Sequence, residues 1–199
     1  MSQARILDAG RPLVLADALV AVPTIAQDAG LVGAMALLIA LCARIAVPLP
    51  YTPVPITGTT LGVLYAGAWL GPRRGALSVA LYLLLGGLGL PFFAAGASGW
   101  AHFMGATGGY LAGFLPAAWL TGSLARRGWD RSPVSALAAM LLGSIVIFAC
   151  GLAVLSFYVP SGQLLEKGFY PFIVGDLAKS CLSAGLLPLG WKALGRRDR

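Results

Sequence analysis

Six long apolar blocks take up most of this chain, and they limit what it can fold into. They cover residues 31–47, 57–70, 75–90, 108–125, 134–159 and 171–194. Hydrophobic residues make up 58% of the 199 residues and charged residues only 11%, whereas about a quarter of an ordinary soluble domain is charged. A soluble protein of this size could not bury that much apolar surface. The blocks therefore predict an all-α membrane protein built as a six-helix transmembrane bundle.

The blocks also predict the domain organisation. We expect one transmembrane domain over residues 31–199, preceded by a cytoplasmic or interfacial lead-in over residues 1–30. The early apolar patch LVLADALVAV is short and is interrupted by Asp17, so a cleaved signal peptide is not expected. Some blocks are shorter than the roughly 20 residues that a helix needs to cross a bilayer. We expect these to extend into the Pro- and Gly-rich segments beside them.

Basic residues lie at both ends of the chain and in every second connection between blocks. These residues are Arg5, Arg11, Arg73, Arg74, Arg126, Arg127, Arg131, Lys192, Arg196, Arg197 and Arg199. The alternate connections hold only Arg44, His102 and Lys167. Because basic loops stay in the cytoplasm, this pattern predicts that both termini are cytoplasmic. The net charge of +7 is then explained by topology, and no nucleic-acid partner is expected.

The sequence contains little that indicates catalysis. It has no phosphate-binding GxxxxGK[ST] motif, no Ser/His/Asp order and no paired catalytic carboxylates, so an intrinsic ATPase is excluded and a membrane enzyme is disfavoured. His102 is alone in a connection, so neither a metal site nor a cofactor is expected. Cys42, Cys150 and Cys181 lie inside apolar blocks without a CxxC motif, and we expect buried free thiols.

Two connections on the predicted outer side differ from ordinary solvent loops. PLPYTPVPITGTT is rich in proline, which removes backbone donors and fixes φ, so a stiff extended segment is expected. GLPFFAAGASGWAHFMGATGGYL is dense in glycine and aromatic residues. Segments of this kind are expected to fold back over a cavity. The alternative is that they only shield the helix ends.

Two opposite charges interrupt the last apolar block, in the run PFIVGDLAKSCLSAGLLPL. The i, i+3 spacing of Asp176 and Lys179 places both on one helix face. An isolated charge at this depth costs roughly 3 kcal/mol or more, so both should face the bundle interior. We expect them to line an outward-opening pocket, where Lys179 is a counter-charge for a carboxylate ligand and Asp176 accepts hydrogen bonds from N–H donors. The alternative is a self-neutralising structural pair.

Three stretches together carry a family resemblance. The run ARIAVPLPYTPVPITGTTLGVLYAGAWLGPRRGALSVALYLLLGGLGLPFFAAGASGW, the following GATGGYLAGF and the late GDLAK resemble the BioY family, the biotin-specific S components of energy-coupling factor transporters. The resemblance implies the S-component fold in a bacterial cytoplasmic membrane, surrounded by lipid. It also implies high-affinity binding of biotin from outside, and transport powered by a separate module of one transmembrane coupling protein and two ATPase subunits.

The resemblance also implies the site. Asp176 and Lys179 match the family's polar ligand contacts, and family members often carry Gln at the position of Thr59. Biotin offers ureido N–H donors to Asp176, and a carboxylate or carbonyl to Lys179; which end of biotin each contacts stays open. Two segments, one with Ser98 and Gly99 and one with Gly108, Gly109 and Tyr110, match family segments that close over the vitamin. Tyr82 and Phe92 could supply apolar walls, with ordinary packing as the alternative. The full set of candidate substrate-binding residues is Asp176, Lys179, Ser98, Gly99, Gly108, Gly109, Tyr110, Thr57, Tyr82 and Phe92.

The first block contains Ala36-Leu-Leu-Ile-Ala40, which resembles the AxxxA motif that docks S components onto the coupling protein. Residues four apart share a helix face, and two alanines let another helix approach closely. Ala36 and Ala40 are therefore the predicted partner-docking residues, with packing inside the bundle as the alternative.

A different functional class also stays open, because a stand-alone or proton-coupled transporter of biotin or another small carboxylate would also use an intramembrane Asp176.

Overall fold

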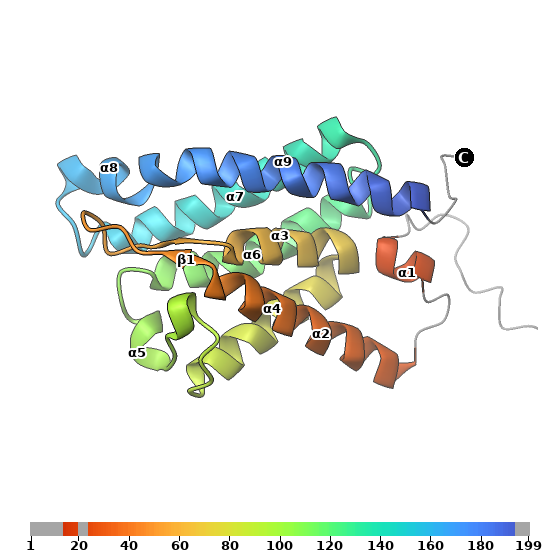
Figure 1. The fold of residues 1–199 in the computed structure, drawn as a ribbon, viewed down its shortest axis with the longest axis horizontal. Coiled ribbons are helices and arrows are strands. Elements are labelled where there is room, and N and C mark those ends of the chain that lie inside the picture. The colour runs from red at the N-terminus through yellow and green to blue at the C-terminus, as the bar shows by residue number, and fades with distance from the viewer. Residues whose placement is uncertain (1–13, 20–23, 194–199) are drawn as a thin grey trace, which may run out of the picture.

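The computed structural model describes residues 14–19 and 24–193. Within these, six helices of 12 residues or more lie lengthwise beside one another (Figure 1). They are α2 (Ile25–Arg44), α3 (Thr59–Leu70), α4 (Pro72–Gly87), α6 (Gly108–Ala125), α7 (Pro133–Leu155) and α9 (Tyr170–Ala193). Each overlaps one of the six apolar blocks, and α6 packs against α3, α4 and α7. The prediction of a mainly helical protein is confirmed.

Short elements connect the long helices. The helical ones are α1 (Leu15–Leu19), η2 (Ala94–Gly96), α5 (Trp100–Phe103), η3 (Ser161–Gln163) and α8 (Leu164–Gly168). Two two-residue strands, β1 (Ala46–Val47) and β2 (Ile56–Thr57), pair antiparallel at the two ends of the proline-rich connection. The connection between them contains turns and bends but no helix, which agrees with the non-helical backbone that its prolines predict.

The first long helix begins earlier than its apolar block, at Ile25. The Thr24 side chain accepts a hydrogen bond from the Gln27 N–H, and the Gln27 side chain accepts one from the Thr24 N–H. This capping box satisfies two backbone donors that would otherwise lack partners at the helix start. Part of the expected lead-in is thus helical, and much of the rest of residues 1–30 lies outside the described residues.

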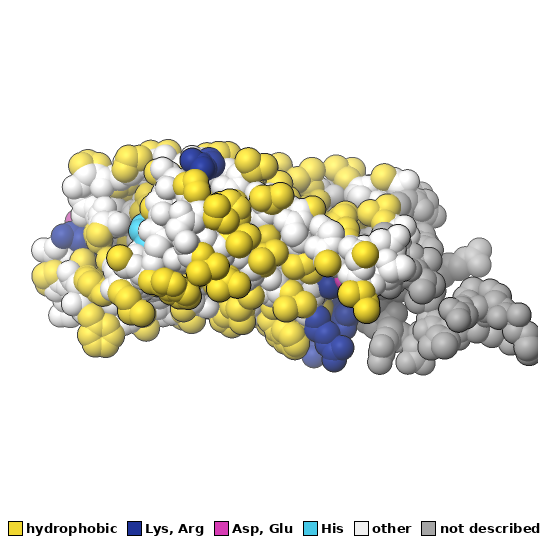
Figure 2. All heavy atoms as spheres, turned by 90° about the horizontal axis from the view of Figure 1, so that it is seen from below, with side chains coloured by type: hydrophobic (Ala, Val, Ile, Leu, Met, Phe, Trp, Pro, Cys, Tyr) yellow, Lys and Arg dark blue, Asp and Glu magenta, His cyan; other side chains and the backbone are white. Residues whose placement is uncertain are grey.

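The outer surface is strongly apolar. Leu41, Ile145 and Val174 are 66%, 61% and 80% exposed, and Figure 2 shows hydrophobic side chains over most of one face. Three helical segments are long and apolar enough to cross a membrane: α2, α7, and the segment 161–193 that ends with α9. Exposed apolar surface on this scale suits lipid and not water, so the chain is a membrane protein.

The basic connections that the structure describes gather at one end of the bundle. Arg74, at the start of α4, contacts Asp17 of α1 at 2.6 Å and Asp28 of α2 at 2.9 Å. The Trp191 side chain near the end of α9 donates a 2.7 Å hydrogen bond to Asp130, between α6 and α7. We call this the basic end; β1, α5 and α8 lie at the opposite end (Figure 1). The predicted basic residues Arg5, Arg11, Arg196, Arg197 and Arg199 lie outside the described residues.

The cysteines are only partly as expected. All three are free thiols, but Cys42 and Cys150 are half-buried and Cys181 is exposed. The expectation of a buried thiol is wrong for Cys181, because this residue lies on the outer face of α9 beside exposed Leu182. An apolar block predicts burial from water, and lipid provides that burial as well as protein does.

Candidate substrate-binding site

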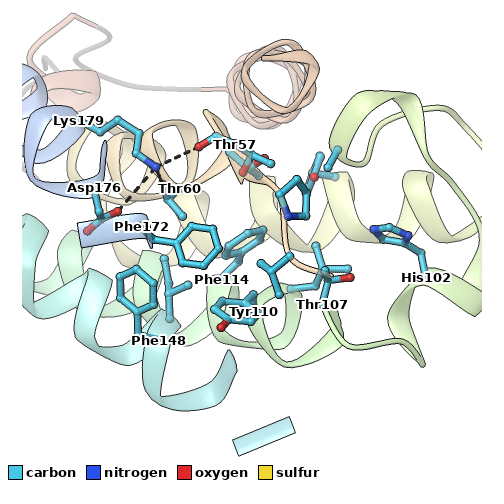
Figure 3. Close-up of a pocket in the computed structure, with 17 residues that line it drawn as sticks. Thr57, Thr60, His102, Thr107, Tyr110, Phe114, Phe148, Phe172, Asp176 and Lys179 are labelled. Atoms are coloured by element: carbon cyan, nitrogen blue, oxygen red, sulfur yellow. Dashed lines mark hydrogen bonds and ion pairs between the residues drawn. The ribbon is translucent and has the colours of Figure 1, made fainter. Parts of the chain in front are cut away.

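A cavity of about 630 Å³, counting its open mouth, lies toward the end that carries α5 and α8. Figure 3 shows side chains from several helices and from the proline-rich connection pointing into it. The lining residues are Val54, Pro55, Thr57, Thr59, Thr60, Tyr82, Ala94, His102, Thr107, Tyr110, Leu111, Phe114, Ile147, Phe148, Phe172, Asp176 and Lys179.

Asp176 and Lys179 form the charged part of the cavity wall. Their side chains are only 7% and 21% exposed. The Lys179 Nζ atom donates to the Thr57 carbonyl oxygen at 3.0 Å and to Thr60 Oγ1 at 2.6 Å. It lies 3.8 Å from Asp176 Oδ1 (Figure 3), which is too long for a hydrogen bond. The two charges are therefore close enough to offset each other, but they do not form a closed pair.

Aromatic rings form the wall beside this charged pair. The Phe148 ring centroid lies 6.3 Å from that of Phe172 and 6.3 Å from that of Tyr110, and Phe114 lies nearby in Figure 3. The Tyr110 hydroxyl donates a 2.7 Å hydrogen bond to the Gly168 carbonyl. Since that hydroxyl already has an acceptor, Tyr110 contributes mainly apolar surface. The cavity suits a ligand with a polar end and an apolar body.

Five of the candidate residues lie together in the lining: Thr57, Tyr82, Tyr110, Asp176 and Lys179. These residues come from distant parts of the chain, and Lys179 on α9 contacts Thr57 across 122 positions of sequence. The structure therefore brings the proline-rich connection and the GDLAK segment to one site.

The other five candidates lie outside the lining. Phe92 stacks on Tyr82 with ring centroids 6.5 Å apart. A Cβ on Gly108 would overlap the backbone of Phe103, and a Cβ on Gly109 would overlap the backbone of Cys150. These glycines allow close approach of the chain around the site.

The remaining two candidates belong to the connection that precedes α5. Gly99 has φ 89°, which favours glycine, and its N–H donates to the Gly86 carbonyl at 2.8 Å. Ser98 is exposed. Both residues thus lie in the wall-forming connection without reaching the cavity surface.

Sequence reasoning missed several lining residues. Phe172 precedes Asp176 by four positions and so shares its helix face, a signal that was available. Thr60 and Phe148 carry no local signal, because their neighbours in sequence are apolar or small. They reach the site only because α3 and α7 pack against α9.

His102 also lines the cavity, away from Lys179 (Figure 3). Its ring stacks on Phe93 with centroids 5.5 Å apart. Burial lowers the pKa of His102, which favours the neutral imidazole. Among the described residues, no group of three or more His, Cys, Asp or Glu side chains is placed to hold a metal ion.

The two predicted docking residues are not on the surface of the described chain. Ala36 is 1% exposed and Ala40 is 6% exposed, within the hydrophobic core. Their burial favours the alternative in which they pack inside the bundle. On the same helix, Ala34 is exposed, and no atom outside the helix lies near the position of a Cβ on Gly30.

Comparison with known proteins places this fold in a family. The profile of the BioY family matches residues 14–196. The biotin transporter BioY of Rhizobium etli is 37% identical over 159 residues, which cover 75% of this chain and 84% of that protein. The biotin transporter BioY of Thermotoga maritima is 39% identical over 149 residues, which cover 74% and 86%.

A solved structure has the same fold. It is the crystal structure of the S-component for biotin from an ECF-type ABC transporter, with a TM-score of 0.77 and 30% identity. The similarity covers 86% of this chain and 95% of that chain. A profile match over nearly the whole length, relatives of this identity and a shared fold together show that this chain belongs to the BioY family.

Proposed function

We propose that this chain is a biotin-binding S component that takes up biotin across the cytoplasmic membrane of a bacterium. The observation that carries the proposal is the cavity in which Asp176 and Lys179 lie beside an aromatic wall. The named functions of the relatives from Rhizobium etli and Thermotoga maritima support it. The chain acts as a transport component and not as an enzyme.

The chemistry of biotin fits the lining. Its ureido group has two N–H donors and one strong acceptor, its thiophane ring is apolar, and its tail ends in a carboxylate. Asp176 accepts hydrogen bonds from ureido N–H groups, while Lys179 donates to the carboxylate or to the ureido carbonyl. Phe148, Phe172 and Tyr110 contact the apolar parts, as aromatic walls do in small-molecule sites.

Six helices cross the membrane in this proposal, with both termini in the cytoplasm. Two features support it: the described basic connections share one end of the bundle, where Arg74 and Asp130 make their contacts, and the cavity lies toward the other end. Basic ends stay in the cytoplasm, so the cavity opens to the outside. The shortest crossing helix, α3 with 12 residues, spans only about 18 Å, and its connections complete the crossing while buried in protein.

Transport then requires a partner module of one transmembrane coupling protein and two ATPase subunits. If α2 is the docking helix, its exposed face carries the contact, because Ala36 and Ala40 lie on its buried face. Gly30 and Ala34 are four positions apart on the exposed side, which allows close helix approach.

Two matched substitutions distinguish docking through the exposed face of α2 from docking through Ala36 and Ala40. Ala34→Trp is expected to preserve biotin binding while co-purification with the module is lost. Ala40→Trp is expected to overpack the core and to lose folding and binding together. Intact folding of the Ala40→Trp protein combined with loss of the module would restore the docking role of Ala36 and Ala40.

Calorimetric titration of the purified protein with biotin, dethiobiotin and thiamine tests the function. Biotin is expected to bind most tightly. Asp176→Asn and Lys179→Ala should each weaken binding tenfold or more, because loss of one partner of a desolvated charged hydrogen bond costs roughly 2 kcal/mol. Glu166→Gln is the matched control, since Glu166 is exposed outside the cavity. Absence of biotin binding to the folded wild-type protein would refute the proposal.

Uptake measurements address the energy source. Uptake in cells with and without the ATPase module, and with an uncoupler, distinguishes an S component from a proton-coupled transporter. An S component requires the module and tolerates the uncoupler over the time of the assay, provided that ATP is maintained. Uptake without the module that collapses with the uncoupler would support the proton-coupled alternative.

A further inference from the structure

The Lys179 ammonium is bound by neutral oxygen atoms. A lysine ammonium has three N–H donors. Two of them are directed to Thr57 O at 3.0 Å and to Thr60 Oγ1 at 2.6 Å, while Asp176 Oδ1 lies 3.8 Å from Nζ. A closed ammonium–carboxylate pair has an N–O distance of about 2.7 to 2.9 Å. The structure therefore has an open charge pair at a position where both side chains are largely buried.

Two largely buried opposite charges would be expected to form a closed pair. Opposite charges attract more strongly where water is largely excluded, and residues three positions apart on α9 can reach each other. Moreover, Thr60 lies in the first turn of α3, where the helix dipole places partial positive charge that disfavours an ammonium. Hydrogen-bond acceptors must offset this effect, and Thr57 O and Thr60 Oγ1 are the two that Lys179 contacts.

The side chain of Thr60 is the part of this contact that sequence can change. The Thr57 acceptor is a backbone carbonyl, which any residue at position 57 would supply. The Thr60 acceptor is a hydroxyl, and it makes the shorter of the two bonds. After accepting from Lys179, this hydroxyl keeps its own O–H donor, and Thr60 itself lines the cavity (Figure 3).

We propose that Thr60 is a positioning residue for ligand binding: its hydroxyl holds Lys179 away from Asp176 and so keeps the charge pair open. The carboxylate oxygens of Asp176 then stay available to N–H donors of the ligand, and the third N–H of Lys179 stays available to a ligand acceptor. Without the hydroxyl, Lys179 closes on Asp176, and the ligand must break that pair before it binds. The inference rests on the proposed function, because biotin affinity reports it.

Thr60→Val removes the hydroxyl with little change of shape, and Thr60→Ser keeps the hydroxyl. We expect Thr60→Val to raise the Kd for biotin tenfold or more and Thr60→Ser to stay within about twofold of wild type; tenfold corresponds to about 1.4 kcal/mol. Thr121→Val is the matched control. Thr121 is buried outside the cavity, and its hydroxyl donates within its own helix. Its loss should leave the Kd unchanged.

A structure of the Thr60→Val protein gives a second readout. The Lys179 Nζ to Asp176 Oδ1 distance is expected to shorten to hydrogen-bond range. If Thr60→Val does not fold, Thr60→Ala carries the same expectations. Wild-type affinity in the folded Val or Ala variant would overturn the inference, and so would equal losses in Val and Ser. If the wild type itself does not bind biotin, the proposed function fails instead, so the two failures are distinguishable.

Discussion

Asp130 is a buried acid that the proposed function does not use, and its replacement by Asn tests the structure far from the cavity. Asp130 is 2% exposed in the connection between α6 and α7. Its Oδ2 atom accepts the 2.7 Å bond from Trp191, whereas Oδ1 has no hydrogen-bond partner within the described part of the chain. Burial raises the pKa of Asp130 from 3.8 to about 6, against the opposing effects of the Trp191 bond and the Arg131 charge.

The sign of the effect follows from proton binding. A raised folded-state pKa means that the folded protein binds the proton more tightly than the unfolded chain does. Asp130 therefore favours folding below pH 4, and this contribution is lost as pH rises through about 6. A shift of about two units corresponds to about 3 kcal/mol. Asn carries no charge and can still accept from Trp191, so Asp130→Asn should be more stable than wild type above pH 7, by up to about 3 kcal/mol.

The assay is the unfolding midpoint of the purified protein in detergent between pH 5 and pH 8. A change of 1 kcal/mol shifts the midpoint of a chain of this size by about 2 to 4 °C. The gap between Asp130→Asn and wild type should widen as pH rises. Asp130→Ala is the control, because it loses the Trp191 acceptor and should not gain as much. Parallel pH profiles for Asn and wild type, or a less stable Asn variant at pH 8, would refute the reasoning.

Two further predictions concern topology and packing. Cysteines placed at Arg73 and Arg127, in a background without native cysteines, are expected to react with a membrane-impermeant reagent only from the cytoplasmic side; labelling at Arg127 from outside would contradict six crossings. Gly151→Ala would place a Cβ against the Tyr110 ring, so we expect a loss of about 1 to 3 kcal/mol of stability and weaker biotin binding. Gly185→Ala, with open space around its Cβ, should change neither, and equal stability of the two variants would count against the packing described.

Much of the fold could be predicted because hydrophobicity and helix signals are local. Each apolar block became one long helix, and the basic segments indicated which ends belong together. The start of α2 was missed although its signal was present: Thr24 and Gln27 have the spacing of a capping box. The burial of Ala36 and Ala40 could not be read from their spacing, because small residues at i, i+4 suit internal packing and external docking equally.

For the site, too, the sequence predicted some features, and others depended on the tertiary structure. The sequence by itself determined that this is a membrane protein. It also determined that Asp176 and Lys179 share one helix face and turn toward the bundle interior, because residues three apart lie on one face and charges in an apolar helix are too costly to expose to lipid. Only the tertiary structure decided which groups the two side chains contact. Lys179 meets Thr60 across 119 positions of sequence, and Tyr110 meets Gly168 across 58. Such partners depend on how helices pack and rotate against one another, and no local pattern of residues fixes that rotation.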